Sequence, residues 1–123
     1  MSRILVVDDE ESVRAVLMAF LTRKGYEVSE AATGPLALAQ LNIFHPHMIL
    51  LDIHMPGMDG IEVLKAIRKQ STEIAVIMVT ATSDEDIGRQ TIDLGANDYI
   101  MKPFTFEQLE MHLSVHLLFR DEE

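Results

Sequence analysis

Carboxylates, a hydroxyl and an ammonium stand directly behind four apolar runs of this sequence. The groups are Asp8 with Asp9, then Asp52, Thr80 and Lys102. Carboxylates that lie close together repel one another, and a hard divalent cation such as Mg²⁺ relieves that repulsion. A carboxylate can also be a nucleophile that forms an aspartyl phosphate, whose oxygens a metal, an ammonium and a hydroxyl can bind. The residue types predict a Mg²⁺ site and a phosphoryl acceptor, provided that the fold brings them together.

Taken singly, each of these groups has a simpler explanation. An acidic pair before a helix usually complements the helix dipole, and Asp52 can cap the turn that Pro56 and Gly57 predict. Thr80 alone is an ordinary strand end, and Lys102 alone is a surface charge. Independent caps need not converge on one crevice, so the combination favours a single site.

Five short runs rich in apolar and β-branched residues predict five strands. They are Ile4–Val7, Glu27–Ala31, Met48–Leu51, Ala75–Val79 and Tyr99–Met101. Strands that are apolar at successive positions are buried on both faces, as in a parallel sheet covered by helices. The second run alternates more and predicts an edge strand.

Helical patterns separate the strands. The first has an apolar stripe and ends at Gly25; the stripe comprises Val13, Val16, Leu17, Phe20 and Leu21. Cap residues mark the other four starts: Thr33 with Pro35, Asp59 with Glu62, Ser83 with Asp86, and Thr105. Gly95 predicts the end of the fourth helix. The pattern is a (βα)₅ doubly wound α/β domain with a five-stranded parallel sheet, whose ligands bind beyond the carboxyl ends of the strands.

Composition excludes several classes of function. The chain has 123 residues, which we interpret as one domain spanning residues 1–123. A net charge of −10 argues against direct binding to nucleic acid or to an anionic membrane surface. The absence of cysteine excludes disulfides and thiolate metal sites. No apolar run approaches the ~20 residues of a membrane span, and no signal peptide is evident, so we expect a cytoplasmic protein.

Five segments, in this order and spacing, resemble the receiver-domain family of two-component response regulators, of the chemotaxis-regulator type. The segments are Ile4–Glu10, Leu50–Gly60, Val79–Ala81, Gly95–Tyr99 and Met101–Phe104. The resemblance implies a flavodoxin-like fold with strand order 2-1-3-4-5. It also implies that Asp52 is the phosphoacceptor, supplied by a sensor histidine kinase or a histidine phosphotransfer protein, and that the domain catalyses only its own phosphorylation and dephosphorylation.

The resemblance further assigns roles to individual residues. Mg²⁺, for which Mn²⁺ could substitute, would be bound directly by Asp9 and Asp52, by Asp8 through water, and by the backbone carbonyl of His54. Thr80 and Lys102 would contact the phosphoryl group, Tyr99 would be the switch aromatic, and the Lys102–Pro103 bond would be cis. His54 and Thr82 occupy positions that vary within the family and that tune how fast the phosphoryl group is lost to water. Neither residue is an acid or an amide that would position a water molecule, so the sequence does not predict the phosphoryl lifetime.

The fourth and fifth predicted helices are candidates for output. The fourth has a narrow stripe of Ile87, Thr91 and Leu94, and Gly88 weakens it by about 1 kcal/mol relative to Ala. The fifth has a core stripe of Leu109, Leu113 and Leu117 and a second, offset apolar stripe. We expect an output surface for a partner, a homodimer or an effector domain, formed by Ile87, Tyr99, Met111, Val115, Leu118 and Phe119.

Other functions compete with this interpretation. A flavodoxin-like redox protein shares the architecture, but the acids behind the first strand would repel a flavin phosphate. An aspartyl-phosphate phosphatase needs an acid where His54 stands, and a constitutive binding module would not need all five site residues. His112 and His116 have a zinc-binding i, i+4 spacing, but we expect no acidic or cysteine partner to complete that set.

Overall fold

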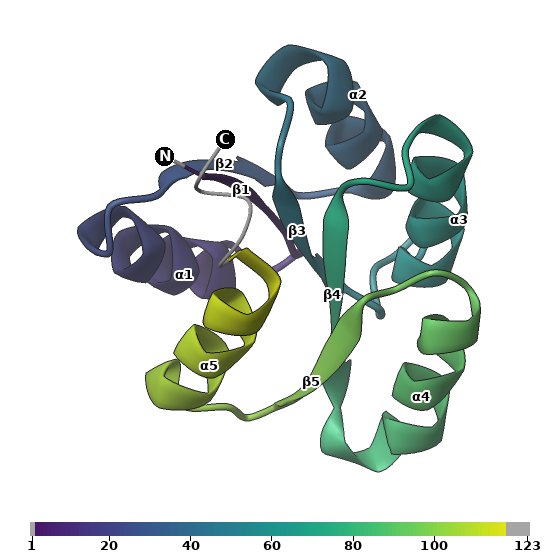
Figure 1. The fold of residues 1–123 in the computed structure, drawn as a ribbon. Helices are drawn as coiled ribbons and strands as arrows, with labels where there is room; N and C mark the ends of the chain where they lie inside the picture. Colours follow the sequence, from purple (N-terminus) through teal and green to yellow (C-terminus); the bar gives the residue numbers. More distant parts are fainter. Residues whose placement is uncertain (1, 118–123) are drawn as a thin grey trace.

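Five strands alternate with five helices along the chain (Figure 1). The structure is a computed structural model that describes residues 2–117, apart from the side chain of Thr82. The strands are β1 (Arg3–Val7), β2 (Glu27–Ala31), β3 (Met48–Asp52), β4 (Ala75–Ala81) and β5 (Asp98–Lys102). The helices are α1 (Glu11–Arg23), α2 (Gly34–Phe44), α3 (Gly60–Gln70), α4 (Glu85–Asp93) and α5 (Phe106–Leu117), with a 3₁₀ turn η1 (Thr82–Asp84) before α4.

All strand pairs are parallel, and the sheet order is β2-β1-β3-β4-β5. This order confirms the predicted doubly wound sheet and places β2 at an edge. The register pairs Asp52 with Val79 and Lys102 with Ala81. Because the strands are parallel and in this register, the residues at their carboxyl ends gather along one edge of the sheet.

The sheet is covered on both faces. One apolar cluster joins it to α2 and α3, with Leu41 and Leu64 inside and Ile87 of α4 packed against it. A second joins the other face to α1 and α5, and includes Leu21 and Leu113. Figure 1 shows the two groups of helices on opposite sides of the strands. Alternate residues of β1, β3 and β4 enter the two clusters, which explains their unbroken apolar sequences.

Most predicted helix ends are confirmed. Asp59 and Glu62 form a reciprocal capping box, and Thr33 accepts a hydrogen bond from the Leu36 amide. Gly25 and Gly95 follow α1 and α4 with positive φ angles, which glycine adopts at little cost. At the start of α5, Thr105 and Gln108 exchange side-chain to backbone hydrogen bonds of 3.1 and 2.8 Å.

The predicted cap of the fourth helix is wrong. The chain leaves β4 through η1, so Ser83 lies inside this turn and α4 begins only at Glu85. Asp84 occupies the N-cap position without a side-chain cap hydrogen bond. Its carboxylate instead contacts His54, a residue 30 positions away, which no local pattern could predict.

The apolar stripes are confirmed in part. Leu109, Leu113 and Leu117 are buried, as the core stripe of α5 requires. Val16 belongs to the predicted core stripe but is 55 % exposed, whereas Leu17 and Leu21 are the buried residues of α1. The predicted Leu94 lies beyond the end of α4 and is also exposed.

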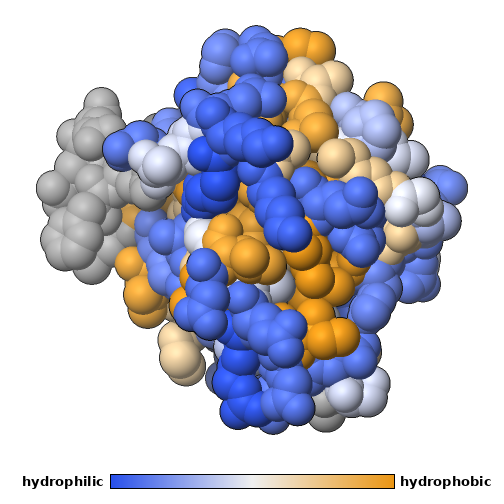
Figure 2. Space-filling view, turned by 90° about the vertical axis from the view of Figure 1, so that its right-hand side faces the viewer, coloured by the Kyte–Doolittle hydropathy of each residue, from blue (hydrophilic) through white to orange (hydrophobic). Residues whose placement is uncertain are grey.

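The offset stripe of α5 is exposed where the structure describes it: Met111 and Val115 are 66 % and 64 % exposed. Leu118 and Phe119, the other members predicted for this surface, lie outside the described residues. The side that carries α3 and α4 is largely hydrophilic, with a hydrophobic strip between two hydrophilic areas (Figure 2). None of the helices within residues 2–117 has the length and hydropathy needed to cross a membrane.

Candidate functional site

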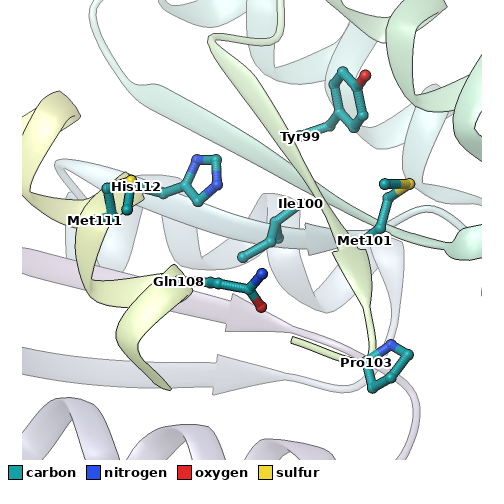
Figure 3. A pocket seen from close by; sticks show the side chains of 7 residues that line it. All are labelled: Tyr99, Ile100, Met101, Pro103, Gln108, Met111 and His112. Carbon is teal, nitrogen blue, oxygen red and sulfur yellow. The ribbon is translucent and has the colours of Figure 1, made fainter. Parts of the chain in front are cut away.

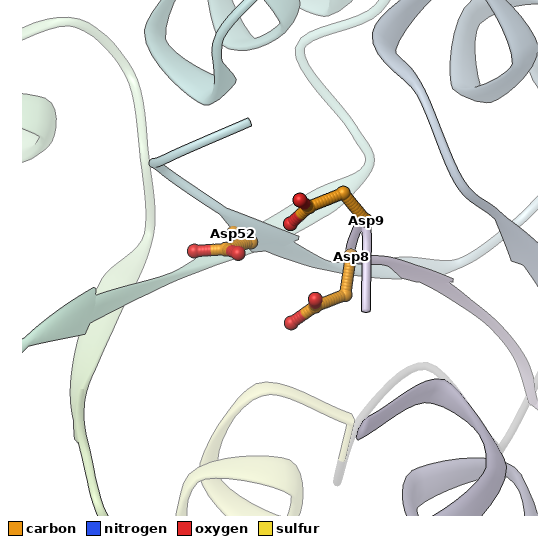
Figure 4. A group of neighbouring side chains, drawn as sticks. All are labelled: Asp8, Asp9 and Asp52. Carbon is orange, nitrogen blue, oxygen red and sulfur yellow. The ribbon is translucent and has the colours of Figure 1, made fainter. Parts of the chain in front are cut away.

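Three carboxylates meet at the carboxyl edge of the sheet. Asp8 and Asp9 follow β1, and Asp52 is the last residue of the neighbouring strand β3. One oxygen from each lies within 4.8 Å of the others, and Figure 4 shows the side chains projecting into the same space. Asp8 and Asp52 are only 3 % and 6 % exposed, whereas Asp9 is open to solvent. The site is half sheltered, with one accessible side.

Backbone groups hold two of these carboxylates in place. The Glu10 amide donates a 2.9 Å hydrogen bond to Oδ1 of Asp8, and the His54 amide donates a 3.3 Å bond to Oδ1 of Asp52. Arg14 of α1 donates to the carbonyl of Asp8 at 2.8 Å, which ties the β1–α1 loop to the first helix. The Oδ2 atoms of Asp8 and Asp52 take no part in these backbone hydrogen bonds and face the crevice.

Lys102 brings a positive charge to the same space from the far edge of the sheet. It ends β5, and its Nζ lies 3.1 Å from Oδ2 of Asp8 and 3.7 Å from Oδ2 of Asp52. The Lys102–Pro103 peptide bond that follows is cis. One ammonium thus lies between the two buried carboxylates.

The electrostatics of the site favour a further cation. Burial raises the pKa of Asp52 to about 6; the Lys102 charge opposes this, and the Asp8 and Asp9 charges add to it. Burial alone would lower the pKa of Lys102, but Asp52 and Asp8 more than offset it and raise that pKa above its ordinary value. Lys102 therefore stays charged, but its single positive charge does not neutralise the negative charges of the three carboxylates.

These residues fit Mg²⁺, which prefers hard oxygen ligands. Two buried carboxylates and one exposed carboxylate supply such oxygens, with an open side for water or a phosphate group. Among residues 2–117, this is the one group of three or more acidic or imidazole side chains with suitably close ligand atoms. The composition and the placement of the donors therefore suit a magnesium site.

Thr80 lies at the same edge, within β4 and one residue before its end. Its side chain is 1 % exposed. The hydroxyl donates weakly to the carbonyls of Ala81 and Asp84, at 3.5 and 3.4 Å. Its present partners thus belong to the segment that leads into α4.

Tyr99 connects this edge with α4. An added Cβ at Gly88 would lie 2.9 Å from Cδ2 of the Tyr99 ring and 3.2 Å from Cγ2 of Thr80. The tyrosine ring therefore packs directly on the backbone of α4. Behind it, a pocket between β5 and α5 is lined by Tyr99, Ile100, Met101, Pro103, Gln108, Met111 and His112 (Figure 3).

The structure also corrects the expectation for the two histidines of α5. An acidic partner does exist: Oδ2 of Asp98 lies 2.6 Å from Nδ1 of His112 and 3.1 Å from Nε2 of His116. Burial alone would raise the pKa of Asp98, but the two imidazoles outweigh it and lower that pKa. The three side chains form a hydrogen-bonded link between β5 and α5. The partner comes from another element, 14 and 18 residues away, so the helical spacing gave no sign of it.

Comparisons with known proteins identify the family and agree with the fold. The model of the response regulator receiver domain family matches residues 4–114. The structure is similar to the chemotaxis protein CheY4 of Vibrio cholerae, with a TM-score of 0.89 and 34% identity, covering 95% of this chain and 99% of that one. The receiver domain of NtrX from Brucella abortus gives a TM-score of 0.89 at 34% identity, covering 93% and 97%.

Curated relatives are longer proteins. A "Probable transcriptional regulator ycf27" of Cyanophora paradoxa is 43% identical over 111 residues, which are 90% of this chain and 46% of that protein. The "Regulatory protein AtoC" of Escherichia coli K12 is 39% identical over 110 residues, 89% of this chain and 24% of that protein. This chain therefore spans less than half the length of these two relatives. Because the family model covers most of the chain and the fold agrees, the chain belongs to the response regulator receiver domain family of two-component systems.

Proposed function

We propose that Asp52 accepts a phosphoryl group from a phosphohistidine, in a reaction that depends on Mg²⁺. The donor is a sensor histidine kinase or a histidine phosphotransfer protein, as the family implies. The observation that carries the proposal is the placement of the buried Asp52 carboxylate beside Asp8, Asp9 and the Lys102 ammonium. A nucleophile, a metal site and a fixed cation are the parts that phosphoryl transfer requires.

The transfer is a simple exchange of bonds. One oxygen of Asp52 attacks phosphorus, the phosphorus–nitrogen bond of the donor breaks, and the donor imidazole keeps the electron pair and takes a proton from water. Asp8, Asp9, Asp52 and the backbone carbonyl of His54 would hold Mg²⁺, or Mn²⁺ in its place. The bound ion supplies charge neutralisation for the phosphoryl oxygens. Lys102 and Thr80 contact the same oxygens once the group is on Asp52.

The domain acts as a switch and not as an enzyme on an external substrate. It catalyses its own phosphorylation and dephosphorylation and passes the change from Thr80 and Tyr99 to the surface of α4, β5 and α5. Ile87, Tyr99, Met111 and Val115 are the described members of this output surface, which binds a partner, a second copy or an effector domain. We place this activity in the cytoplasm, within a single domain of residues 1–123 that does not itself bind nucleic acid.

Intact mass spectrometry tests the proposal. With acetyl phosphate and Mg²⁺, the protein should gain about 80 Da, the mass of one phosphoryl group on an aspartate. Asp52→Ala should gain nothing, and the exposed acid Asp93 provides a matched control, since Asp93→Asn should label like the wild type. Excess EDTA should abolish the gain. Equal labelling of Asp52→Ala would show that the acceptor lies elsewhere.

A further inference from the structure

A hydrogen bond joins two side chains from the segments that follow β3 and β4, which are neighbouring strands of the sheet. Nε2 of His54, in the loop after β3, lies 2.7 Å from Oδ2 of Asp84, at the end of η1. The Asp84 side chain is partly buried, and that of His54 is mostly exposed. The two residues belong to the loops that flank Asp52, and the roles assigned above leave their side chains unused.

Each partner is also connected to a site residue through the backbone. The His54 amide donates to Asp52, the acceptor, and the Asp84 carbonyl accepts from the hydroxyl of Thr80. The chain of contacts therefore runs from Asp52 through His54 and Asp84 to Thr80. At the end of this chain, the Thr80 hydroxyl lies 3.4 Å from the carbonyl of Asp84.

We infer that the His54–Asp84 pair positions η1 and Thr80 in the resting state and opposes their movement toward a phosphoryl group on Asp52. The inference rests on the proposed function, in which Thr80 contacts that group. To do so, the hydroxyl must leave the carbonyl of Asp84. Because His54 holds the Asp84 side chain, η1 and its Asp84 carbonyl cannot move freely. The Thr80 hydroxyl must therefore give up this hydrogen bond when it turns toward the phosphoryl group. The pair therefore raises the free energy needed to convert the resting form into the phosphoryl-bound form.

The expected size follows from the nature of the pair. Hydrogen bonds between partly exposed side chains contribute modestly, so breaking this one should change the switching equilibrium by up to about fivefold, which corresponds to about 1 kcal/mol. Asp84 and His54 are positioning residues here, since they act through Thr80. The direction is specific: removing the pair should favour the phosphoryl-bound form.

Beryllofluoride with Mg²⁺, a mimic of the phosphoryl group on a carboxylate, provides the binding test. Asp84→Asn and His54→Ala should each bind it more tightly than the wild type, by two- to fivefold. In a double-mutant cycle the pair of changes should have about the effect of one, because both remove the same bond. His54→Ala leaves the charge at the start of α4 intact. Glu85→Gln, which removes a neighbouring exposed charge, should bind like the wild type.

Amide hydrogen exchange in the resting protein supplies a reading that needs no phosphoryl chemistry. Residues 85–90 should exchange faster in Asp84→Asn and His54→Ala than in the wild type and Glu85→Gln. If the wild type fails to bind beryllofluoride, the proposed function is wrong, but the exchange rates still decide whether the pair restrains this segment. Unchanged exchange, weaker binding in the variants, or additive effects in the cycle would each overturn the inference.

Discussion

Lys102 Nζ lies 3.1 Å from Asp8 Oδ2, although 94 residues separate the two in the chain. The contact joins the last strand of the sheet to the loop after the first. It also places the ammonium 3.7 Å from Asp52. The same cation balances two acids in this structure, and under the proposed function it also contacts the phosphoryl oxygens after transfer.

Replacing Lys102 with Met should have opposite effects on metal binding and on labelling. We expect tighter binding of Mg²⁺, because a competing positive charge is lost, and phosphorylation by acetyl phosphate slowed roughly tenfold or more, because one fixed electrostatic contact is lost. Calorimetric titration measures the first effect and timed intact mass the second. Lys69→Met, an exposed lysine of α3, is the control. Labelling of Lys102→Met at the wild-type rate would contradict the role given to the ammonium.

The raised pKa of Asp52 predicts how stability depends on pH without metal. Burial raises this pKa from 3.8 to about 6, so the folded protein binds the proton more tightly than the unfolded chain. The contribution of Asp52 to the free energy of unfolding therefore decreases as pH rises from about 4 to 6, and stays low above that range. In EDTA, Asp52→Asn should be more stable than the wild type at pH 7.5, on the order of 1–3 kcal/mol.

Urea unfolding followed by far-ultraviolet circular dichroism measures this difference, since the chain has no tryptophan. The advantage of Asp52→Asn should shrink toward zero as pH falls to 4. A difference that stays constant between pH 4 and 7.5 would show that the ionised carboxylate is not the cause.

Magnesium should stabilise the protein through the three carboxylates. A ligand that binds only the folded form at 100 times its Kd adds about 2.7 kcal/mol, so saturating Mg²⁺ should raise Tm by several degrees. Asp9→Asn should abolish most of this rise in Tm. Its Tm in EDTA should stay near the wild-type value, because Asp9 is exposed. Differential scanning calorimetry with and without Mg²⁺ gives both values, and Asp93→Asn should respond fully. A full response from Asp9→Asn would remove that residue from the metal site.

Gly88→Ala should reveal how closely Tyr99 packs on α4. Alanine favours a helix by about 1 kcal/mol over glycine, but here the new methyl would lie 2.9 Å from the Tyr99 ring. We expect Gly88→Ala to give no gain or a loss of stability in the wild type, and a gain approaching 1 kcal/mol when Tyr99 is also replaced by Ala. Urea midpoints of the four proteins provide the cycle. The same gain in both backgrounds would mean that the ring moves aside freely.

Local sequence patterns were enough to predict the sheet and the residues at its edge. Unbroken apolar runs specify strands buried on both faces, and the cap residues Thr33, Asp59 and Thr105 mark helix starts through contacts three residues apart. The parallel arrangement then brings the strand ends together. Such information is local or repeats with a fixed period, so it is present in a single sequence.

Contacts between distant elements could not be predicted in this way. The bonds of Asp84 with His54 and of Asp98 with His112 depend on the relative placement of loops and helices. The misplaced cap at Ser83 has the same cause, because a 3₁₀ turn after β4 delays α4. The exposure of Val16 likewise depends on how α1 packs on the sheet, which the helical period alone does not specify.

The two apolar clusters on opposite faces of the sheet have a consequence for how such a chain can diversify. Residues such as Leu50 and Ile49 are enclosed, one on each face, while Asp9, His54 and Asp84 lie in the connections after the strands, outside both clusters. Substitutions of these three residues leave both apolar clusters unchanged, so under the proposed function the core of the domain and the timing of its chemistry depend on separate sets of residues. Under that function, the lifetime of a signal can be retuned, over generations or by design, on an unchanged scaffold.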